Sequence, residues 1–250
     1  MDNFKPCATL PAPDPNASYN AAITENPINA PTPSSSLCKK RAVGDYTKFW
    51  RAGRTLNVYF IDPVQADDKI EFMKVFDKWS EHAHLKFKLA THNAAEIRIK
   101  TNTEENFSYL GTDALLIDKT EPTMLISLLP ANEHFECTLL HEIGHAIGFY
   151  HEHAHRDADI PWNEPKVYEY YKKHFNWDKS DVDTNIFSRA DGAVVDTEYD
   201  KTSIMHYPVS ATLTDGKWEV GINTELSAKD KYAANKCYPA TPDDVPWQKT

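Results

Sequence analysis

Three histidines, one glutamate and one glycine fall within a short segment at a spacing that suits a metal site. Residues 141–151 read H-E-x-x-H-x-x-G-x-x-H. Residues four apart on a helix lie on one face, so His141 and His145 can present two imidazoles to one metal ion. Gly148 can end the helix in a sharp turn, because glycine adopts a positive φ at little cost. That turn would return His151 as a third ligand.

This segment also predicts hydrolytic chemistry. Three neutral imidazoles leave one coordination position open, which is typical of a catalytic zinc site rather than a structural one. Zn²⁺ held in this way polarises a peptide carbonyl and lowers the pKa of bound water. Glu142 directly follows the first ligand, so its carboxylate can lie beside the metal and act first as general base and then as general acid. A lone His-x3-His pair would more often be accidental, but the full motif predicts a zinc hydrolase with one Zn²⁺ per chain.

A second motif, Ser203-Ile204-Met205-His206-Tyr207, lies further along the chain. This motif, and the position of Glu152 directly after the third histidine, resemble the astacin-type (peptidase M12A) zinc metalloendopeptidases of the metzincin clan, in particular microbial members. The resemblance extends from about residue 46 to residue 239. It implies that Met205 underlies the zinc site and that Tyr207 stabilises the oxyanion of the transition state or binds zinc. It also implies that Glu152 contacts the mature amino terminus.

The same resemblance implies a fold and a division of the chain. The expected fold is α+β, of the zincin (metzincin) type, with a twisted, mostly five-stranded sheet, two helices over a zinc cleft and an irregular C-terminal lobe. The catalytic domain would span 42–250, with the zinc helix in an N-terminal lobe over 42–151 and the methionine turn in a C-terminal lobe over 152–250. The implied function is hydrolysis of peptide or protein substrates.

Apolar periodicity predicts the elements that position the site. We expect strands over 56–61, 85–89, 97–99, 114–117 and 124–129. We expect helices over 70–83, over 135–147 and over 167–175, with the apolar side chains of the second facing the core opposite the ligands. The segment 112–116 is a candidate cleft edge, to which an extended peptide could add by main-chain hydrogen bonds. We expect solvent-exposed side chains at His153 and His155, and a His206 ring that points away from zinc.

Residues 1–41 are rich in proline, alanine, asparagine and serine, which predicts a flexible leader or pro-segment. Lys39-Lys40-Arg41 is either a processing site that leaves Ala42 as the new amino terminus or an ordinary solvated loop. Cys38 could cap zinc and keep the enzyme latent, although a disulfide, for example to Cys237, is the commoner explanation. The four cysteines (Cys7, Cys38, Cys137 and Cys237) permit two disulfides without requiring them, and their positions do not match the pairing of many astacins.

Composition limits the partners and leaves the compartment open. The 250 residues carry a net charge of −10 without a long basic block, which disfavours nucleic acid and anionic membranes as partners. No apolar run is long enough to span a membrane, and residues 1–20 show no signal-peptide core. The family resemblance alone favours a secreted protein, and we expect a monomer. Two alternatives to an active peptidase stay open: a latent zymogen blocked by residues 1–41, and a non-catalytic zinc-binding interaction protein.

Overall fold

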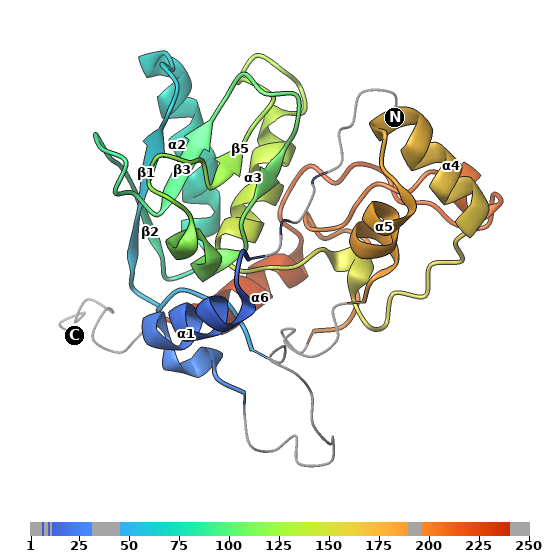
Figure 1. The fold of residues 1–250 in the computed structure, drawn as a ribbon, viewed down its shortest axis with the longest axis horizontal. Helices are drawn as coiled ribbons and strands as arrows, with labels where there is room; N and C mark the ends of the chain where they lie inside the picture. Colours follow the sequence, from blue (N-terminus) through green and yellow to red (C-terminus); the bar gives the residue numbers. More distant parts are fainter. Residues whose placement is uncertain (1–6, 8–9, 11, 32–45, 190–196, 241–250) are drawn as a thin grey trace, which may run out of the picture.

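A five-stranded mixed sheet forms the centre of the first half of the chain (Figure 1). The computed structural model describes residues 7, 10, 12–31, 46–189 and 197–240. The strand order is β2-β1-β3-β5-β4, and β4 is the one antiparallel member of the sheet and lies at its edge. The strands are β1 (Thr55–Phe60), β2 (Lys86–Leu89), β3 (Ile97–Lys100), β4 (Phe107–Ser108) and β5 (Met124–Leu125). This sheet and its helices confirm the predicted α+β fold.

Two long helices, α2 (Ala66–Ser80) and α3 (Phe135–Ala146), pack with the sheet around one apolar core. In α3, the apolar side chains expected to face the core are all buried: Leu139, Ile143, Ala146 and, at its end, Ile147. Trp79 anchors the two helices to each other, because its indole N–H donates to the Leu140 carbonyl oxygen at 3.0 Å. The predicted zinc helix is therefore held rigidly against the sheet.

The strand predicted over 114–117 is wrong. This segment is the 3-10 helix η3 (Gly111–Leu116), and the edge of the sheet is instead the short strand β4. Gly111 has a φ of +49°, and a Cβ at that position would lie 1.9 Å from the Lys48 carbonyl oxygen. The backbone therefore turns at Gly111, which ends the extended segment, and the apolar residues after it face the core from a helix.

The second half of the chain has little regular structure, as predicted for the C-terminal lobe. Its helices are α4 (Glu164–Phe175), α5 (Lys179–Val182) and α6 (Ala228–Cys237), with short 3-10 turns at η4 (Glu152–Ala154) and η6 (Ala211–Thr214) and a π-helical turn at η5 (Asp183–Phe187). Figure 1 shows α4 and α5 apart from the half of the molecule that holds the sheet. The aromatic side chains of α4 belong to a second core, in which Tyr171 stacks on Trp177 with ring centroids 5.0 Å apart.

Part of the leader is folded, contrary to the expectation of flexibility. Residues 15–29 form α1 (Pro15–Glu25) and η1 (Pro27–Asn29), and α1 packs against η3. The Ser18 hydroxyl donates to the buried Asp113 carboxylate at 2.5 Å, and the Asn29 side-chain amide donates to the Phe49 carbonyl oxygen at 2.8 Å. The serine and asparagine side chains that suggested disorder therefore make polar contacts with the catalytic domain. Lys39, Lys40, Arg41 and Cys38 lie outside the described residues.

Candidate active site

The three predicted ligands converge on one point. His141 and His145 lie one turn apart on α3, and His151 reaches them from the segment that follows the helix. The Nε2 atom of His145 lies 3.1 Å from Nε2 of His141 and 2.9 Å from Nε2 of His151. All three side chains are buried. The structure thus brings together three ring nitrogens from the two ends of the motif.

The protonation of these rings fits a metal ion. Nδ1 of His141 lies 2.8 Å from the Ile204 carbonyl oxygen, and Nδ1 of His145 lies 2.8 Å from the Phe149 carbonyl oxygen. Since a carbonyl oxygen only accepts, each Nδ1 donates, and Nε2 is left with a lone pair that faces the other rings. Burial lowers the pKa of His141 to about 4 and holds the pKa values of His145 and His151 well below the usual range. Neutral rings with converging lone pairs form a donor set suited to Zn²⁺.

Gly148 makes the turn that returns His151. Its φ is +100°, a conformation that side-chain-bearing residues rarely adopt. A Cβ at this position would also lie 2.8 Å from Cδ1 of Phe49. The Gly148 N–H donates to the His145 carbonyl oxygen at 2.8 Å, which closes the end of α3. Both the backbone angle and the space therefore call for glycine here.

Met205 lies against the zinc helix, as the resemblance implied. A Cβ on Gly144 would lie 2.2 Å from Sδ of Met205, so this glycine lets the methionine turn approach the helix closely. The Glu152 N–H donates to the Met205 carbonyl oxygen at 2.9 Å. These contacts fix the segment after the third histidine on the methionine turn.

Asp230 holds the methionine turn from the other side, a role that no pattern in the sequence predicts. Its carboxylate accepts from the Ser203 hydroxyl at 2.6 Å and from the Ile204 N–H at 2.8 Å. It also accepts from the Ser227 N–H at 2.9 Å and so closes a capping box at the start of α6. The Ser-x-x-Asp spacing of this box, Ser227 to Asp230, is visible in the sequence, but the bond from Asp230 to a turn 26 residues away is not.

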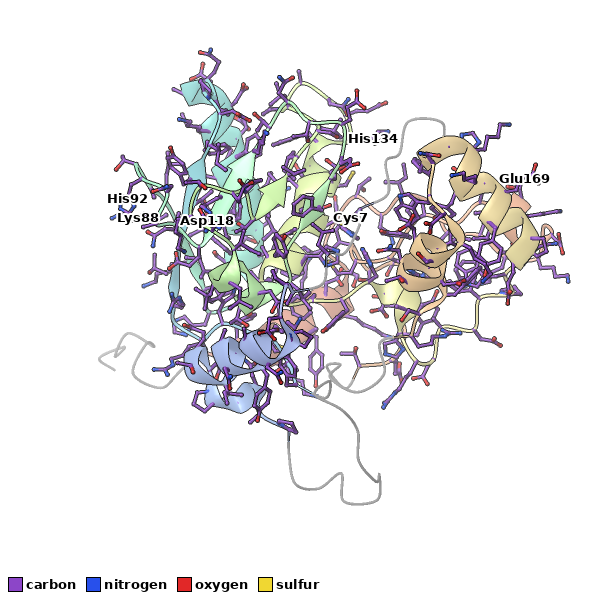
Figure 2. The ribbon with its side chains drawn as sticks, viewed as in Figure 1. Cys7, Lys88, His92, Asp118, His134 and Glu169 are labelled. Atoms are coloured by element: carbon purple, nitrogen blue, oxygen red, sulfur yellow. The ribbon has the colours of Figure 1, made fainter. Side chains whose placement is uncertain are left out.

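Glu142 lies next to the histidine cluster and has an unexpected partner from the leader. The Cys7 thiol donates to Oε2 of Glu142 at 3.2 Å, and Figure 2 shows Cys7 between α3 and the C-terminal lobe. One ligand atom from each of Cys7, His141, His145 and His151 lies within 4.8 Å of the others. Burial raises the pKa of Glu142 to about 8, and burial and Glu142 together raise the pKa of Cys7. Cys38 was the one cysteine considered from the sequence as an alternative latency ligand, whereas the structure brings Cys7 to the site.

Tyr207 lies beside the cluster and is 2% exposed. Its ring centroid is 4.3 Å from that of His151 and 6.0 Å from that of His141. Burial raises the pKa of its phenol well above the usual range, so the side chain is neutral and keeps its O–H. It is therefore placed as a hydrogen-bond donor next to the candidate metal ligands.

The other histidines near the site form hydrogen bonds within the C-terminal lobe. His153 and His155 are buried, so the expectation that they are solvent exposed is wrong. Their Nε2 atoms lie 2.8 Å from the Asn185 carbonyl oxygen and 3.0 Å from the Thr197 carbonyl oxygen, and both therefore support loops of this lobe. Nδ1 of His206 lies 2.6 Å from the Tyr207 carbonyl oxygen and Nε2 lies 2.6 Å from the Tyr199 hydroxyl, so both ring nitrogens are engaged away from the cluster.

Glu152 lines a second cavity, whose other lining residues include His151, Met205, Asp200 and Asp230. Its Oε1 accepts from the Asp200 N–H at 2.7 Å, and burial raises the pKa of its carboxyl to about 8. The predicted contact between Glu152 and a mature amino terminus at Ala42 stays a prediction, because Ala42 lies outside the described residues.

A comparison with protein families shows which family the chain belongs to. The family model described as Astacin (Peptidase family M12A) matches residues 42–239. The chain belongs to the astacin family. Family M12A is a peptidase family, and several of the relatives that the chain matches are named zinc metalloproteinases. Zn²⁺ is the metal that this family uses, and His141, His145 and His151 form the cluster able to hold it.

Individual relatives of this astacin-family chain agree with that assignment. The solved structure of myroilysin superposes with a TM-score of 0.72 at 34% identity, over 78% of this chain and 97% of that one. Protein SpAN of Strongylocentrotus purpuratus is 28% identical over 75% of this chain, and the zinc metalloproteinase nas-28 of Caenorhabditis elegans is 24% identical over 73%. The chain spans only 30% and 34% of the lengths of these two curated relatives.

Proposed function

We propose that this chain hydrolyses peptide bonds with His141, His145 and His151 as zinc ligands and Glu142 as the catalytic acid and base. The observation that carries the proposal is the convergence of three buried imidazole nitrogens beside a buried carboxylate. Zn²⁺, when bound, supplies Lewis-acid polarisation of the peptide carbonyl and lowers the pKa of water. Side chains of the protein carry out the remaining steps, which are proton transfer and stabilisation of the oxyanion.

Glu142 is suited to move a proton in both directions. It takes the proton of the attacking water and then delivers it to the nitrogen of the leaving amine. Burial raises its pKa to about 8, which is closer to neutral pH than the usual pKa of a glutamate. Because the pKa lies near the pH of the reaction, the side chain can both accept and donate a proton. Its position on α3, directly after His141, keeps the carboxylate beside the metal ligands while its rigid helix prevents large movement.

Tyr207 is proposed to stabilise the oxyanion that forms on the carbonyl oxygen. Its neutral phenol can donate a hydrogen bond to this oxygen, and such a donor typically contributes about 10²- to 10³-fold to kcat. We expect Tyr207→Phe to lower kcat by about this factor with a small change in KM, measured by steady-state cleavage of a fluorogenic peptide. An unchanged kcat would exclude Tyr207 from the mechanism.

A latent form of the same peptidase is favoured by Cys7. Its thiol completes a four-atom cluster with the three histidines, and a thiolate is a strong ligand for Zn²⁺. In this structure the same thiol donates to Glu142, the proposed general base. With zinc bound, the sulfur would coordinate as a thiolate, and Glu142 is within reach to take the proton that it loses. We therefore propose that the chain as written is a zymogen in which Cys7 closes the active site. The non-catalytic alternative is less well supported, since Glu142 is intact.

Cys7 also lies where an extended substrate would bind. It forms an isolated parallel β-bridge with Asn106, next to β4 at the edge of the sheet. One side of β4 pairs with β5, so the other side presents backbone groups to a chain in the cleft. We propose that substrate adds to this edge of β4, in place of the edge near 112–116 that the sequence suggested. The leader then competes with substrate for main-chain hydrogen bonds as well as for the metal.

Removal of the metal tests the proposed peptidase. We expect the full chain carrying Cys7→Ala to cleave a denatured protein, to lose all cleavage when zinc is chelated, and to regain it with one equivalent of Zn²⁺. Fragments identified by mass spectrometry would give the cleavage sites. A zinc-loaded variant that cleaves nothing, matched by a chain starting at Ala42 that also cleaves nothing, would favour the non-catalytic zinc protein instead.

Other expectations stay predictions. We propose a secreted monomer that does not act on nucleic acid, which the family resemblance and the net charge of −10 support. None of the described helices is long and apolar enough to cross a bilayer. Sedimentation of the purified full chain at a single monomer mass would support the monomer, and a stable dimer would contradict it.

A further inference from the structure

A pocket opens next to Glu142, on the side of the cluster where Cys7 sits. It is a narrow pocket in this Cys7-closed form, and together with the open solvent at its mouth it spans about 360 Å³. Its walls come from the start of α3, from the methionine turn and from a loop of the C-terminal lobe, and the main lining residues are Cys137, Thr138, Ile204, Pro208 and Ile222. Cys137 and Thr138 precede His141 by one turn of the same helix, so the pocket begins at the catalytic groups.

The position of the pocket determines which substrate residue it would hold. Under the proposed mechanism, Glu142 must reach the nitrogen of the leaving amine in order to protonate it. The residue that supplies this nitrogen therefore lies on the Glu142 side of the metal ligands, with its side chain directed at the pocket. The pocket consequently selects the residue that follows the cleaved bond.

Three of the polar side chains in the pocket wall, those of Cys137, Asn223 and His206, already have hydrogen-bond partners. The Cys137 thiol donates to the His134 carbonyl oxygen at 3.2 Å. Both hydrogens of the Asn223 amide are used, at 2.9 Å to the Lys201 carbonyl oxygen and 2.7 Å to the Ser203 carbonyl oxygen. The two ring nitrogens of His206 also have partners. These groups therefore offer few hydrogen-bond donors to a substrate side chain.

The charge of the pocket excludes both kinds of ionised side chain. Among the described residues that line it, none is lysine, arginine or aspartate, and Glu142 is the one carboxylate. An acidic substrate side chain would be desolvated beside Glu142 with no cation to pair with. A lysine or arginine side chain would form an ion pair with Glu142 and withdraw it from proton transfer.

From this pocket we infer that the enzyme cleaves before uncharged residues with an apolar side chain, such as leucine, methionine or valine, and that Ile222 helps set this preference. The inference rests on the proposed function and adds the class of substrate residue to it. Ile222 is a partly buried residue packed against the main core, and it contributes an apolar part of the pocket wall that does not come from α3.

A peptide library tests the inference. The full chain carrying Cys7→Ala is given peptides that differ only in the residue after the cleaved bond, and kcat/KM is measured for each. We expect leucine to exceed aspartate and lysine by at least about tenfold, the lower end of what an apolar pocket provides. A preference for a charged residue, or equal rates for all, would overturn the inference. If no peptide is cleaved at all, the proposed peptidase itself fails, and the inference with it.

Variants at Ile222 locate the preference in this pocket. Adding Ile222→Arg should shift the profile towards aspartate and glutamate, because a guanidinium in the wall can pair with a carboxylate. Ile222→Leu is the matched control and should keep the apolar preference. Circular dichroism would show whether Ile222→Arg is folded, and a folded variant with an unchanged profile would overturn the assignment of this pocket. The profile of the parent remains decisive if Ile222→Arg does not fold.

Discussion

Replacement of Glu142 by glutamine is expected to lower kcat for peptide cleavage by about 10²- to 10⁴-fold while zinc stays bound, the range attributed to general acid–base catalysis. Glutamine has nearly the same shape as glutamate but cannot take a proton from the attacking water. The three histidine nitrogens that hold the metal are unaffected, because their Nδ1 partners are backbone carbonyl oxygens and not Glu142. Glu142→Ala should give the same loss. The measurement is steady-state cleavage in a Cys7→Ala background, with zinc content determined by atomic absorption.

Glu136→Gln is the matched control for this experiment. Glu136 lies on the same helix, but its half-exposed side chain pairs with Lys78 on α2 and does not face the cluster. We expect it to leave kcat within about twofold, as surface substitutions change little. If Glu142→Gln cleaves as fast as its parent while the control also does, Glu142 is not the acid and base.

Replacement of Cys7 by alanine is expected to raise the activity of the full chain strongly. If Cys7 holds the closed form over the open form at about 99 to 1, its removal raises the open fraction, and with it the rate, about a hundredfold. The closed form is favoured because the thiol is buried at the junction of the metal ligands and the general base. The measurement is the initial rate of peptide cleavage by intact chains, with mass spectrometry confirming that residues 1–41 are still attached.

Cys237→Ala controls for a general effect of losing a thiol. Cys237 ends α6, is partly buried against the main core and does not line the pocket beside Glu142. We expect this variant to be as inactive as the parent full chain. Equal rates for the parent, Cys7→Ala and Cys237→Ala chains would contradict latency through Cys7.

The local parts of the site were predictable from the sequence because they depend on helix geometry. The spacing of His141 and His145 fixes two ligands on one helix face, and Gly148 marks the turn that brings the third. The burial of Ile143 and Ile147 follows from the same periodicity. These features require contacts only between residues close in sequence.

Features that depend on distant contacts were missed. Cys7 meets Glu142 across 135 residues, and no local pattern distinguishes it from Cys38. His153 and His155 look like solvent-exposed residues of a polar loop, yet carbonyl oxygens from distant loops satisfy their ring nitrogens and allow them to be buried. Apolar residues at 114–117 predicted a strand, but the turn at Gly111 against Lys48 made this segment helical.

The leader illustrates the same limit in another way. Its proline and asparagine content predicted flexibility, which is a rule about segments that lack a partner surface. In this chain Asp14 caps α1 through the Asn16 N–H, and Asn29 bonds to the backbone of the catalytic domain. Asp14 thus caps the helix of the leader, while Ser18 and Asn29 anchor it to that surface.

X-ray absorption at the zinc edge tests most directly the central claim, that three histidines hold zinc and Cys7 closes the site. For the zinc-loaded full chain we predict three imidazole nitrogens at about 2.0–2.1 Å and one sulfur at about 2.3 Å. In Cys7→Ala the sulfur should be replaced by a light atom, with the three imidazoles kept. A full chain without a sulfur ligand, or with fewer than three imidazoles in either protein, would contradict the account.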